Sequence, residues 1–216
     1  MSYSLLFDIG NVIIGFDFQI SVRRIAGMCA VEPEQIFQSV EELKDDFESG
    51  KISPDQFLDQ AIEKTGYTGE RDFLIRAFQE VFELNEPMAS LIEAESARGT
   101  PLYLLSNTNG IHVPYFLKTY SIFDRFDDAI YSHEVFAMKP DPKIYEIAIS
   151  KLQLNPGKTI YIDDLPENCA AGRLHGLQAI DYNMTEHARF LERFEKIRSG
   201  LEENCIQGSE SRKLDS

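Results

Sequence analysis

Short apolar runs that each end in a polar cluster constrain the fold of this 216-residue chain more than any other feature. Each run has the length of a buried strand, and helical patterns at 88–98, 142–152 and 167–174 separate the runs. The strand-like runs are 3–7, 102–105, 129–131, 159–162 and 177–182. Alternating strands and helices are typical of a parallel sheet, so the sequence predicts an α/β, Rossmann-like fold with helices on both faces.

The polar clusters all follow predicted strands directly. Asp8 ends the first run, Ser106 and Asn107 end the second, and Asp163 and Asp164 end a later one. In open α/β sheets, ligands bind in the crevice beyond the carboxyl ends of the strands. We therefore expect these side chains to meet at one site.

The stretch from 16 to 84 interrupts the alternation, because it reads as successive amphipathic helices without a convincing strand. Ser53 is a suitable N-cap for a helix that begins at Pro54. We predict an all-helical cap at 16–84, inserted into a Rossmann-like core formed by 1–15 and 85–202. The polar segment 203–216 lacks periodicity and is predicted to be disordered.

The charge balance limits the partners of the chain. With 21 Lys and Arg residues against 36 Asp and Glu residues, the net charge is -15, which repels nucleic-acid backbones and anionic membranes. Three cysteines without metal-ligand spacing favour a reducing compartment. No signal peptide or membrane span is recognisable. We therefore expect a cytoplasmic protein that binds neither nucleic acid nor membrane, whereas its oligomeric state is left open.

The residues at the strand ends have a chemical meaning as a set. Asp8, Asp163 and Asp164 supply few hard oxygen ligands, which suit Mg²⁺ bound together with a substrate phosphate. Lys139 and the Ser106 region would hold the remaining phosphate oxygens while an aspartate attacks phosphorus. Each cluster alone is an ordinary cap or turn, so the prediction depends on their order and their positions after strands.

Four segments, FDIGNV, LLSNTN, MKPDPKIY and YIDDLPEN, resemble in this order the motifs of the haloacid dehalogenase superfamily. The resemblance covers nearly the whole folded chain. It is closest to the phosphatase branch with a small helical cap, which includes sugar-phosphate phosphatases that begin FDLGNV. It implies an Mg²⁺-dependent phosphoric monoester hydrolase that acts on a small phosphorylated metabolite.

The resemblance also implies roles for individual residues. Asp8 would be the nucleophile that forms an aspartyl-phosphate, and Lys139 would steady the nucleophile and the phosphate. Ser106 and Asn107 would bind the phosphoryl group. His112 follows the second motif, and we include it as a candidate for substrate contact.

A metal site is implied by the same resemblance. Asp164, Asp8 and the backbone carbonyl of Gly10 would ligate Mg²⁺, with Asp163 as an alternative or supporting ligand. Asn168, four residues after Asp164, matches the asparagine of the DDxxxN form of the last motif. It is expected to orient these carboxylates.

Gly10 departs from the commoner DxDx[TV] motif, whose second aspartate protonates the leaving group and later activates water. General acid–base assistance is worth roughly 10² to 10⁴ in rate, so its absence favours substrates with stable leaving groups, such as anomeric sugar phosphates. The missing aspartate also leaves a second alternative open, namely that the protein is a non-catalytic relative that binds a phosphometabolite or a protein. A 2-haloacid dehalogenase is a third alternative, which the acidic pair Asp163–Asp164 disfavours. The physiological substrate cannot be read from the sequence.

Overall fold

The computed structural model describes residues 3–214, and side chains up to residue 203. Its central sheet has the strand order β5-β4-β1-β6-β7, with all neighbours parallel. The strands are β1 (Ser4–Phe7), β4 (Leu102–Ser106), β5 (Asp128–Tyr131), β6 (Thr159–Asp163) and β7 (Gln178–Asp181). The predicted α/β fold is confirmed. Strand order reverses at β1, which places the ends of β1, β4 and β6 around one crevice.

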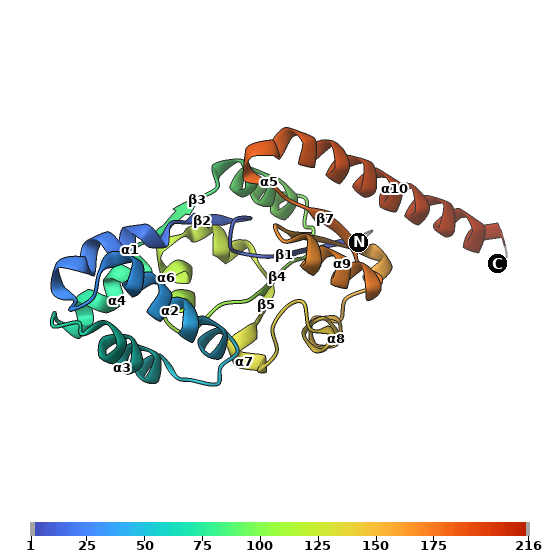
Figure 1. Cartoon of the computed structure of the whole chain (residues 1–216). Helices are drawn as coiled ribbons and strands as arrows, with labels where there is room; N and C mark the ends of the chain where they lie inside the picture. The colour runs from blue at the N-terminus through green and yellow to red at the C-terminus, as the bar shows by residue number, and fades with distance from the viewer. Residues whose placement is uncertain (1–2, 215–216) are drawn as a thin grey trace.

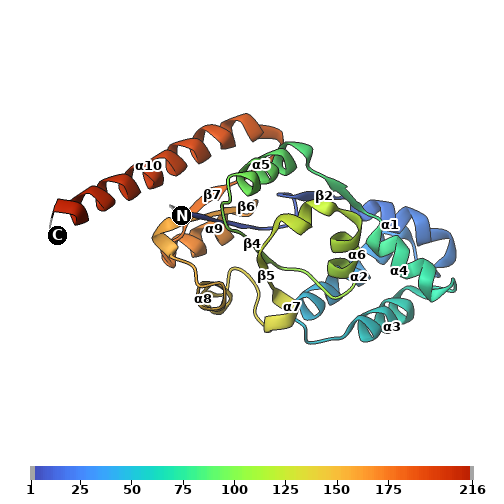
Figure 2. The same ribbon diagram turned by 180° about the vertical axis from the view of Figure 1, so that it is seen from behind.

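Successive side chains of β1 enter two different cores. Leu5 and Phe7 pack with α5 (Glu86–Ala97), α6 (His112–Thr119) and α10 (His187–Leu214). Leu6 packs on the opposite face with α8 (Pro142–Lys151) and α9 (Pro166–Leu174). Figures 1 and 2 show α5 and α10 on one side of the sheet and α8 and α9 on the other. Both faces are therefore covered, which explains why the strands are continuously apolar.

The insertion contains four helices with a core of their own. These are α1 (Phe18–Ile25), α2 (Pro33–Glu48), α3 (Pro54–Thr65) and α4 (Arg71–Gln79). Their buried residues include Ile36, Phe47, Phe57, Leu58 and Phe78. In Figure 1 they gather at the end of the molecule away from the C-terminal part of α10. As the sequence predicts, Ser53 caps α3, because its side chain accepts a hydrogen bond from the Gln56 N–H at 3.2 Å.

A short antiparallel ribbon joins the cap to the core. It pairs β2 (Ile14–Phe16) with β3 (Phe82–Leu84). The sequence did not predict it, because three-residue strands carry too little pattern to separate them from a helical region. The remaining elements are a short helix, α7 (Ser132–Val135), and 3₁₀ turns at Ala26–Met28, Ser121–Arg125, Pro156–Lys158 and Met184–Glu186.

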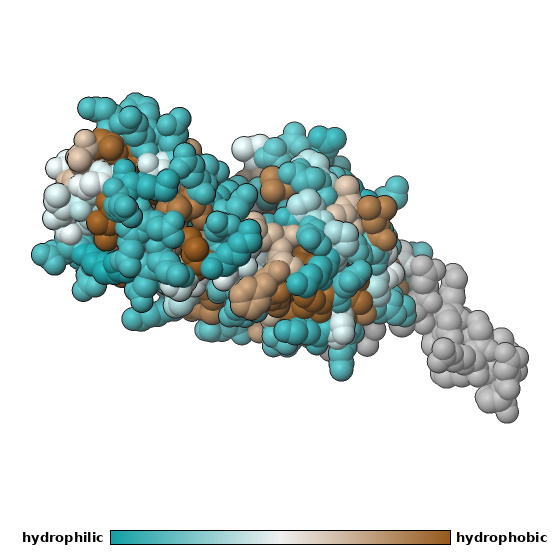
Figure 3. All heavy atoms as spheres, turned by 60° about the horizontal axis from the view of Figure 1, so that its bottom comes forward, coloured by the Kyte–Doolittle hydropathy of each residue, from teal (hydrophilic) through white to brown (hydrophobic). Residues whose placement is uncertain are grey.

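In the segment 203–216, which is expected to be disordered, α10 continues to Leu214, and residues 215–216 lie outside the part of the chain that the structure describes. Extending an existing helix needs no new nucleation, so a polar segment can continue one without a periodic apolar face. No helix within residues 3–214 combines the length and the hydropathy needed to cross a membrane. The face shown in Figure 3 is largely hydrophilic and carries smaller hydrophobic patches.

Candidate active site

One cleft between the cap and the sheet brings the predicted site residues together. It lies at the carboxyl ends of β1, β4 and β6 and receives side chains from α1, α2, α6 and β3. Asp163 is the only predicted site residue that is not in the wall, since it lies fully buried beneath it. The predicted residues in the wall are Asp8, Gly10, Ser106, Asn107, His112, Lys139, Asp164 and Asn168.

A buried lysine joins two carboxylates at the floor of the cleft. The Lys139 ammonium lies 2.8 Å from Asp8 Oδ1 and 2.6 Å from Asp163 Oδ2, and it also donates to the Leu105 carbonyl at 3.0 Å. Asp8 and Asp163 raise the pKa of Lys139 against the effect of burial. Lys139 is therefore a fixed cation beside the Asp8 carboxylate.

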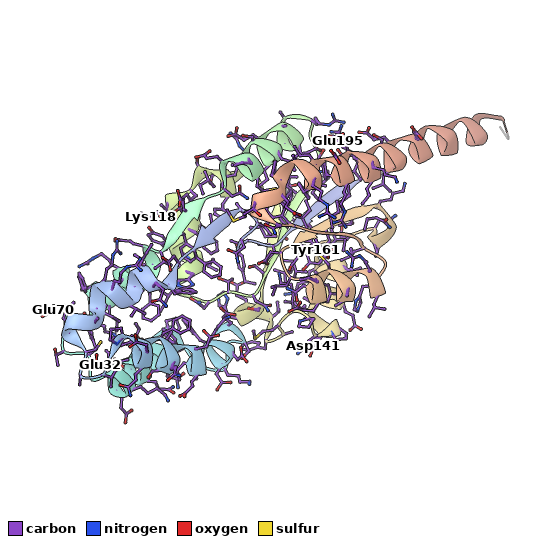
Figure 4. The ribbon with its side chains drawn as sticks, turned by 45° about the horizontal axis from the view of Figure 1, so that its top comes forward. Glu32, Glu70, Lys118, Asp141, Tyr161 and Glu195 are labelled. Atoms are coloured by element: carbon purple, nitrogen blue, oxygen red, sulfur yellow. The ribbon has the colours of Figure 1, made fainter. Side chains whose placement is uncertain are left out.

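Asp163 has its hydrogen-bonding capacity filled by the protein. Besides Lys139, its carboxylate accepts from the Tyr161 hydroxyl, the Leu165 N–H at 2.9 Å and Asn168 Nδ2 at 2.9 Å. Figure 4 shows Tyr161 inside the sheet region, far from the cap residues. Burial alone would raise the pKa of Asp163, but Lys139 and these donors lower it. Asp163 thus acts as an ionised anchor for Lys139 and Asn168.

Asp164, by contrast, faces the cleft with few partners. Asn11 donates to Asp164 Oδ2 at 3.1 Å, and burial is the main cause that raises the pKa of Asp164. Adjacent residues at the end of β6 therefore differ in function: one carboxylate is held by the fold, and the next is available to a ligand.

The floor of the cleft carries more negative than positive charge. Three carboxylates, from Asp8, Asp163 and Asp164, have oxygens within 4.8 Å of one another, and Lys139 is the single basic side chain that pairs with them among residues 3–203. Burial and Asp163 raise the pKa of Asp8 to about 7, although Lys139 lowers it. A divalent cation would offset this excess charge.

The donor set fits magnesium. Asp8 and Asp164 supply two carboxylates, and Gly10 lines the same cleft. Asn168 Oδ1 is buried and receives no hydrogen bond from any described residue, so it is an acceptor that the water molecules of a hydrated cation would satisfy. Few carboxylates, oxygen donors and retained waters are typical of Mg²⁺ sites.

Ser106 and Asn107 lie at the end of β4, but their side chains make different hydrogen bonds. The Asn107 side chain accepts from the Lys139 N–H at 2.8 Å and donates to the Lys139 carbonyl at 2.9 Å. It therefore positions the loop that carries Lys139. The Ser106 hydroxyl has only a long contact of 3.5 Å to the Asn107 carbonyl, so it remains available to a ligand in the cleft.

His112 lies in an aromatic wall above this floor. Its ring stacks on Phe18 at 5.9 Å and meets Phe82 edge to face at 5.0 Å, and its Nδ1 lies 3.1 Å from Asn109 Nδ2. Burial lowers the pKa of His112 to about 4. His112 is thus neutral near pH 7 and offers the substrate a ring face rather than a positive charge.

The buried histidine should make the stability of the protein sensitive to acid. An unfolded histidine titrates near 6.5, so as the pH falls from about 6.5 to 4 the unfolded state of this protein takes up a proton before the folded state. This one group is expected to cost up to about 3 kcal/mol of the free energy of unfolding. Denaturant unfolding at both pH values measures this effect. The difference between the two free energies of unfolding should be smaller in His112→Gln than in the parent protein. An equal difference in the variant and the parent would show that His112 is not the source of the acid sensitivity.

The position that lacks the second aspartate is filled from the neighbouring ribbon. A Cβ on Gly10 would lie 3.1 Å from Cε1 of Phe16, whose ring stands in the cleft. The Gly10 backbone is not in the left-handed region, so a side chain there is opposed by the Phe16 ring and not by backbone strain. A side chain at residue 10 would therefore require the Phe16 ring to shift by a few tenths of an ångström.

Glu48 is a cleft residue that the sequence did not single out. It is the last residue of α2, is half-buried, and lines the same cleft as Asp8 and Lys139. Burial is the main cause that raises the pKa of Glu48 to about 7. No local pattern could have identified it, because carboxylates are frequent along α2 and most of them are solvated.

Ser132 fixes the end of α2 to the core. This fully buried serine donates to the Glu48 carbonyl at 2.6 Å and accepts from the Thr108 N–H at 2.9 Å. Close by, Gly50 has φ 74°, and a Cβ there would lie 2.3 Å from the His133 carbonyl oxygen. Only glycine permits this approach of cap and core. Glu48 is therefore held at a defined place above the site.

Replacing Ser132 by alanine is expected to lower the free energy of unfolding by about 1–3 kcal/mol, because the Glu48 carbonyl and the Thr108 N–H lose a buried partner. Denaturant unfolding measures the change. Ser90→Ala is the matched control, since the exposed Ser90 hydroxyl bonds only the carbonyl one turn back in its helix. A loss no larger than that of the control would show that the contact does not hold the cap.

Comparisons with known proteins agree with this geometry. The family model described as haloacid dehalogenase-like hydrolase matches residues 4–176. A sesquiterpene phosphatase of Aspergillus oryzae is 25% identical over 179 residues, covering 80% of this chain and 85% of its own. A D-ribitol-5-phosphate phosphatase of Bacteroides thetaiotaomicron is 24% identical over 193 residues, covering 82% and 90%.

A solved structure extends the likeness to three dimensions. It is a haloacid-dehalogenase-family enzyme of Bacteroides thetaiotaomicron in complex with magnesium and inorganic phosphate. It has a TM-score of 0.74 and 25% identity, covering 85% of this chain and 96% of its own. Because the family model spans most of the chain and the fold agrees, this protein belongs to the haloacid dehalogenase-like hydrolases.

Proposed function

We propose that this hydrolase is a magnesium-dependent phosphatase that hydrolyses a small phosphorylated metabolite through an aspartyl-phosphate on Asp8. The observation that carries the proposal is the placement of the Asp8 carboxylate, which is buried at the cleft floor, ion-paired with Lys139 and close to the open carboxylate of Asp164. A nucleophile, a fixed cation and a site for Mg²⁺ are the parts that phosphoryl transfer needs.

The residues of the site have different roles in the proposed reaction. Lys139 orients Asp8 and, with the Ser106 hydroxyl, would hold phosphoryl oxygens, while Asp163 keeps Lys139 in place. Asp8 and Asp164, with the Gly10 carbonyl, would hold the metal. When bound, Mg²⁺ supplies positive charge that neutralises the phosphoryl oxygens. Asp8 attacks phosphorus and the bond from phosphorus to the leaving oxygen breaks; water then attacks the aspartyl-phosphate, which releases phosphate and the free Asp8 carboxylate.

The names of two relatives and the lining of the cleft bear on the substrate. The two phosphatases are named for an apolar sesquiterpene and for a polyol phosphate. In this chain the wall above the phosphate site is formed by Phe16, Phe18, Phe82 and His112, and a second cavity, lined mainly by apolar residues, continues from it into the cap. This wall favours a substrate whose leaving group has an apolar face over a substrate whose leaving group is fully hydrated.

A panel of phosphate monoesters tests the proposal. It should include alkyl, terpenyl, polyol and sugar phosphates, with phosphate release measured in magnesium and after removal of the metal with a chelator. We expect magnesium-dependent release from at least one class, fastest where the organic group is apolar. Release that is equally fast in the chelated protein would contradict the role of the metal.

A second candidate function is non-catalytic binding of a phosphometabolite or a protein, which the replacement of the usual acid by Gly10 and the Phe16 ring favours. The two functions differ in turnover. Binding of members of the panel without any phosphate release would favour the binding function.

A further inference from the structure

Proton transfer to the leaving group has no donor at the usual place in this site. When the bond between phosphorus and the leaving oxygen breaks, an alkoxide needs a proton, and a positioned acid is worth roughly 10² to 10⁴ in rate. Gly10 has no side chain, and the Phe16 ring lies close to it. Another group in the cleft must supply the proton if poor leaving groups are hydrolysed.

Few titratable groups line the cleft. Asp8, Lys139 and Asp164 have roles at its floor, as described above. His112 is neutral, because burial lowers its pKa to about 4, and its Nδ1 is in contact with Asn109. The titratable groups that remain in the wall are Lys44 and Glu48.

Glu48 is better placed than Lys44 to transfer a proton. Lys44 is solvent-exposed, with 46% of its side chain accessible, and lies 3.8 Å from Glu41. Glu48 is half-buried, and no side chain among residues 3–203 pairs with its carboxyl group. It also lines both the cleft and the apolar cavity in the cap. Glu48 therefore lies where the cleft that contains Asp8 borders the cavity in the cap.

We propose that Glu48 is the general acid and base of this enzyme and replaces, from the cap, the aspartate that the first motif lacks at Gly10. This inference rests on the proposed phosphatase function. In the first step Asp8 bonds to phosphorus, the bond to the leaving oxygen breaks, and the Glu48 carboxylic acid gives that oxygen its proton. In the second step the Glu48 carboxylate takes a proton from water, whose oxygen attacks phosphorus and releases phosphate from Asp8.

The surroundings of Glu48 suit both steps. Burial, with contributions from Asp45, Asp8 and Glu41, raises the pKa of Glu48 to about 7, and Lys44 lowers it. A group with a pKa near the working pH can give and take a proton in one cycle. The charged and titratable groups around it are Glu41, Lys44 and Asp45 on α2, Asp8, Lys139 and Asp164 in the cleft, His112 on α6 and His133 on α7.

The test compares Glu48→Gln with the parent on phosphate esters whose leaving groups range from p-nitrophenol through phenol to a simple alcohol. We expect kcat/KM to fall roughly 10²- to 10⁴-fold on the alkyl ester and less than about tenfold on the p-nitrophenyl ester. The alkaline limb of the parent's pH profile on the alkyl ester should disappear. Glu34→Gln is the matched control, because it removes the same charge from the exposed first turn of α2, which lines neither cavity, and should leave the profile unchanged.

The other outcomes are equally informative. An equal loss on all esters, or no loss on the alkyl ester, would overturn the role of Glu48 in proton transfer, while the phosphatase function would stand. Absence of turnover in the parent on every ester would instead overturn the phosphatase function. Circular dichroism and melting temperature check that Glu48→Gln is folded. Glu48→Asp, which keeps the acid, should retain part of the alkyl-ester activity.

Discussion

Replacing Asp8 by asparagine is expected to lower phosphate release by about 10⁴- to 10⁶-fold, since the amide has nearly the shape of the carboxylate but cannot form an aspartyl-phosphate. The fold should remain, because Lys139 keeps its ion pair with Asp163 at 2.6 Å. Steady-state phosphate release and the melting temperature measure the two effects.

The exposed Asp72 on α4 gives a control for this variant, because Asp72→Asn makes the same chemical change far from the cleft. It should leave turnover unchanged. Phosphate release by Asp8→Asn at a rate near that of the parent would show that Asp8 is not the nucleophile.

Asp164→Asn is expected to weaken magnesium binding by about 10- to 100-fold or more, because one of the two carboxylates that would ligate the metal is removed. Stability without metal should not fall, since burial already raises the pKa of Asp164 and a neutral amide avoids the cost of its charge. Calorimetric titration with magnesium and denaturant unfolding test the two statements. An unchanged magnesium titration would remove Asp164 from the metal site.

Asp163→Asn should behave in the opposite way. It removes one of the two carboxylates that pair with buried Lys139, together with the acceptor of the Tyr161 hydroxyl, and breaking a buried ion pair typically costs about 3–5 kcal/mol. The free energy of unfolding should therefore drop much more than in Asp164→Asn. Equal stability of the two variants would contradict the division between an anchoring and a ligating carboxylate.

The strands and the meeting of the strand-end residues could be predicted from sequence for physical reasons. Strands covered on both faces are continuously apolar, and parallel strands bring their carboxyl ends to one edge of the sheet. Asp8, Ser106, Lys139 and Asp164 thus converge although more than a hundred residues separate the first from the last.

Other features depend on tertiary contacts that leave no local signal. Asp163 and Asp164 are identical residues at adjacent positions, and the donors to Asp163 from Lys139, Tyr161, Leu165 and Asn168 separate their functions. In the sequence, Glu48 cannot be told from the solvated acidic residues along α2. The tertiary contact with Ser132 fixes it above the cleft. The Phe16 ring over Gly10 likewise depends on the β2–β3 ribbon, whose three-residue strands the sequence did not reveal.

Trapping of the phosphoenzyme tests the central claim most directly. The parent protein would be mixed with magnesium and its best phosphate ester, quenched in acid within milliseconds, digested and examined by mass spectrometry. The mechanism predicts one phosphoryl group on the peptide that contains Asp8, absent in Asp8→Asn. Phosphate release by the parent with no phosphorylated peptide at any quench time, or with the phosphoryl group on another residue, would contradict it.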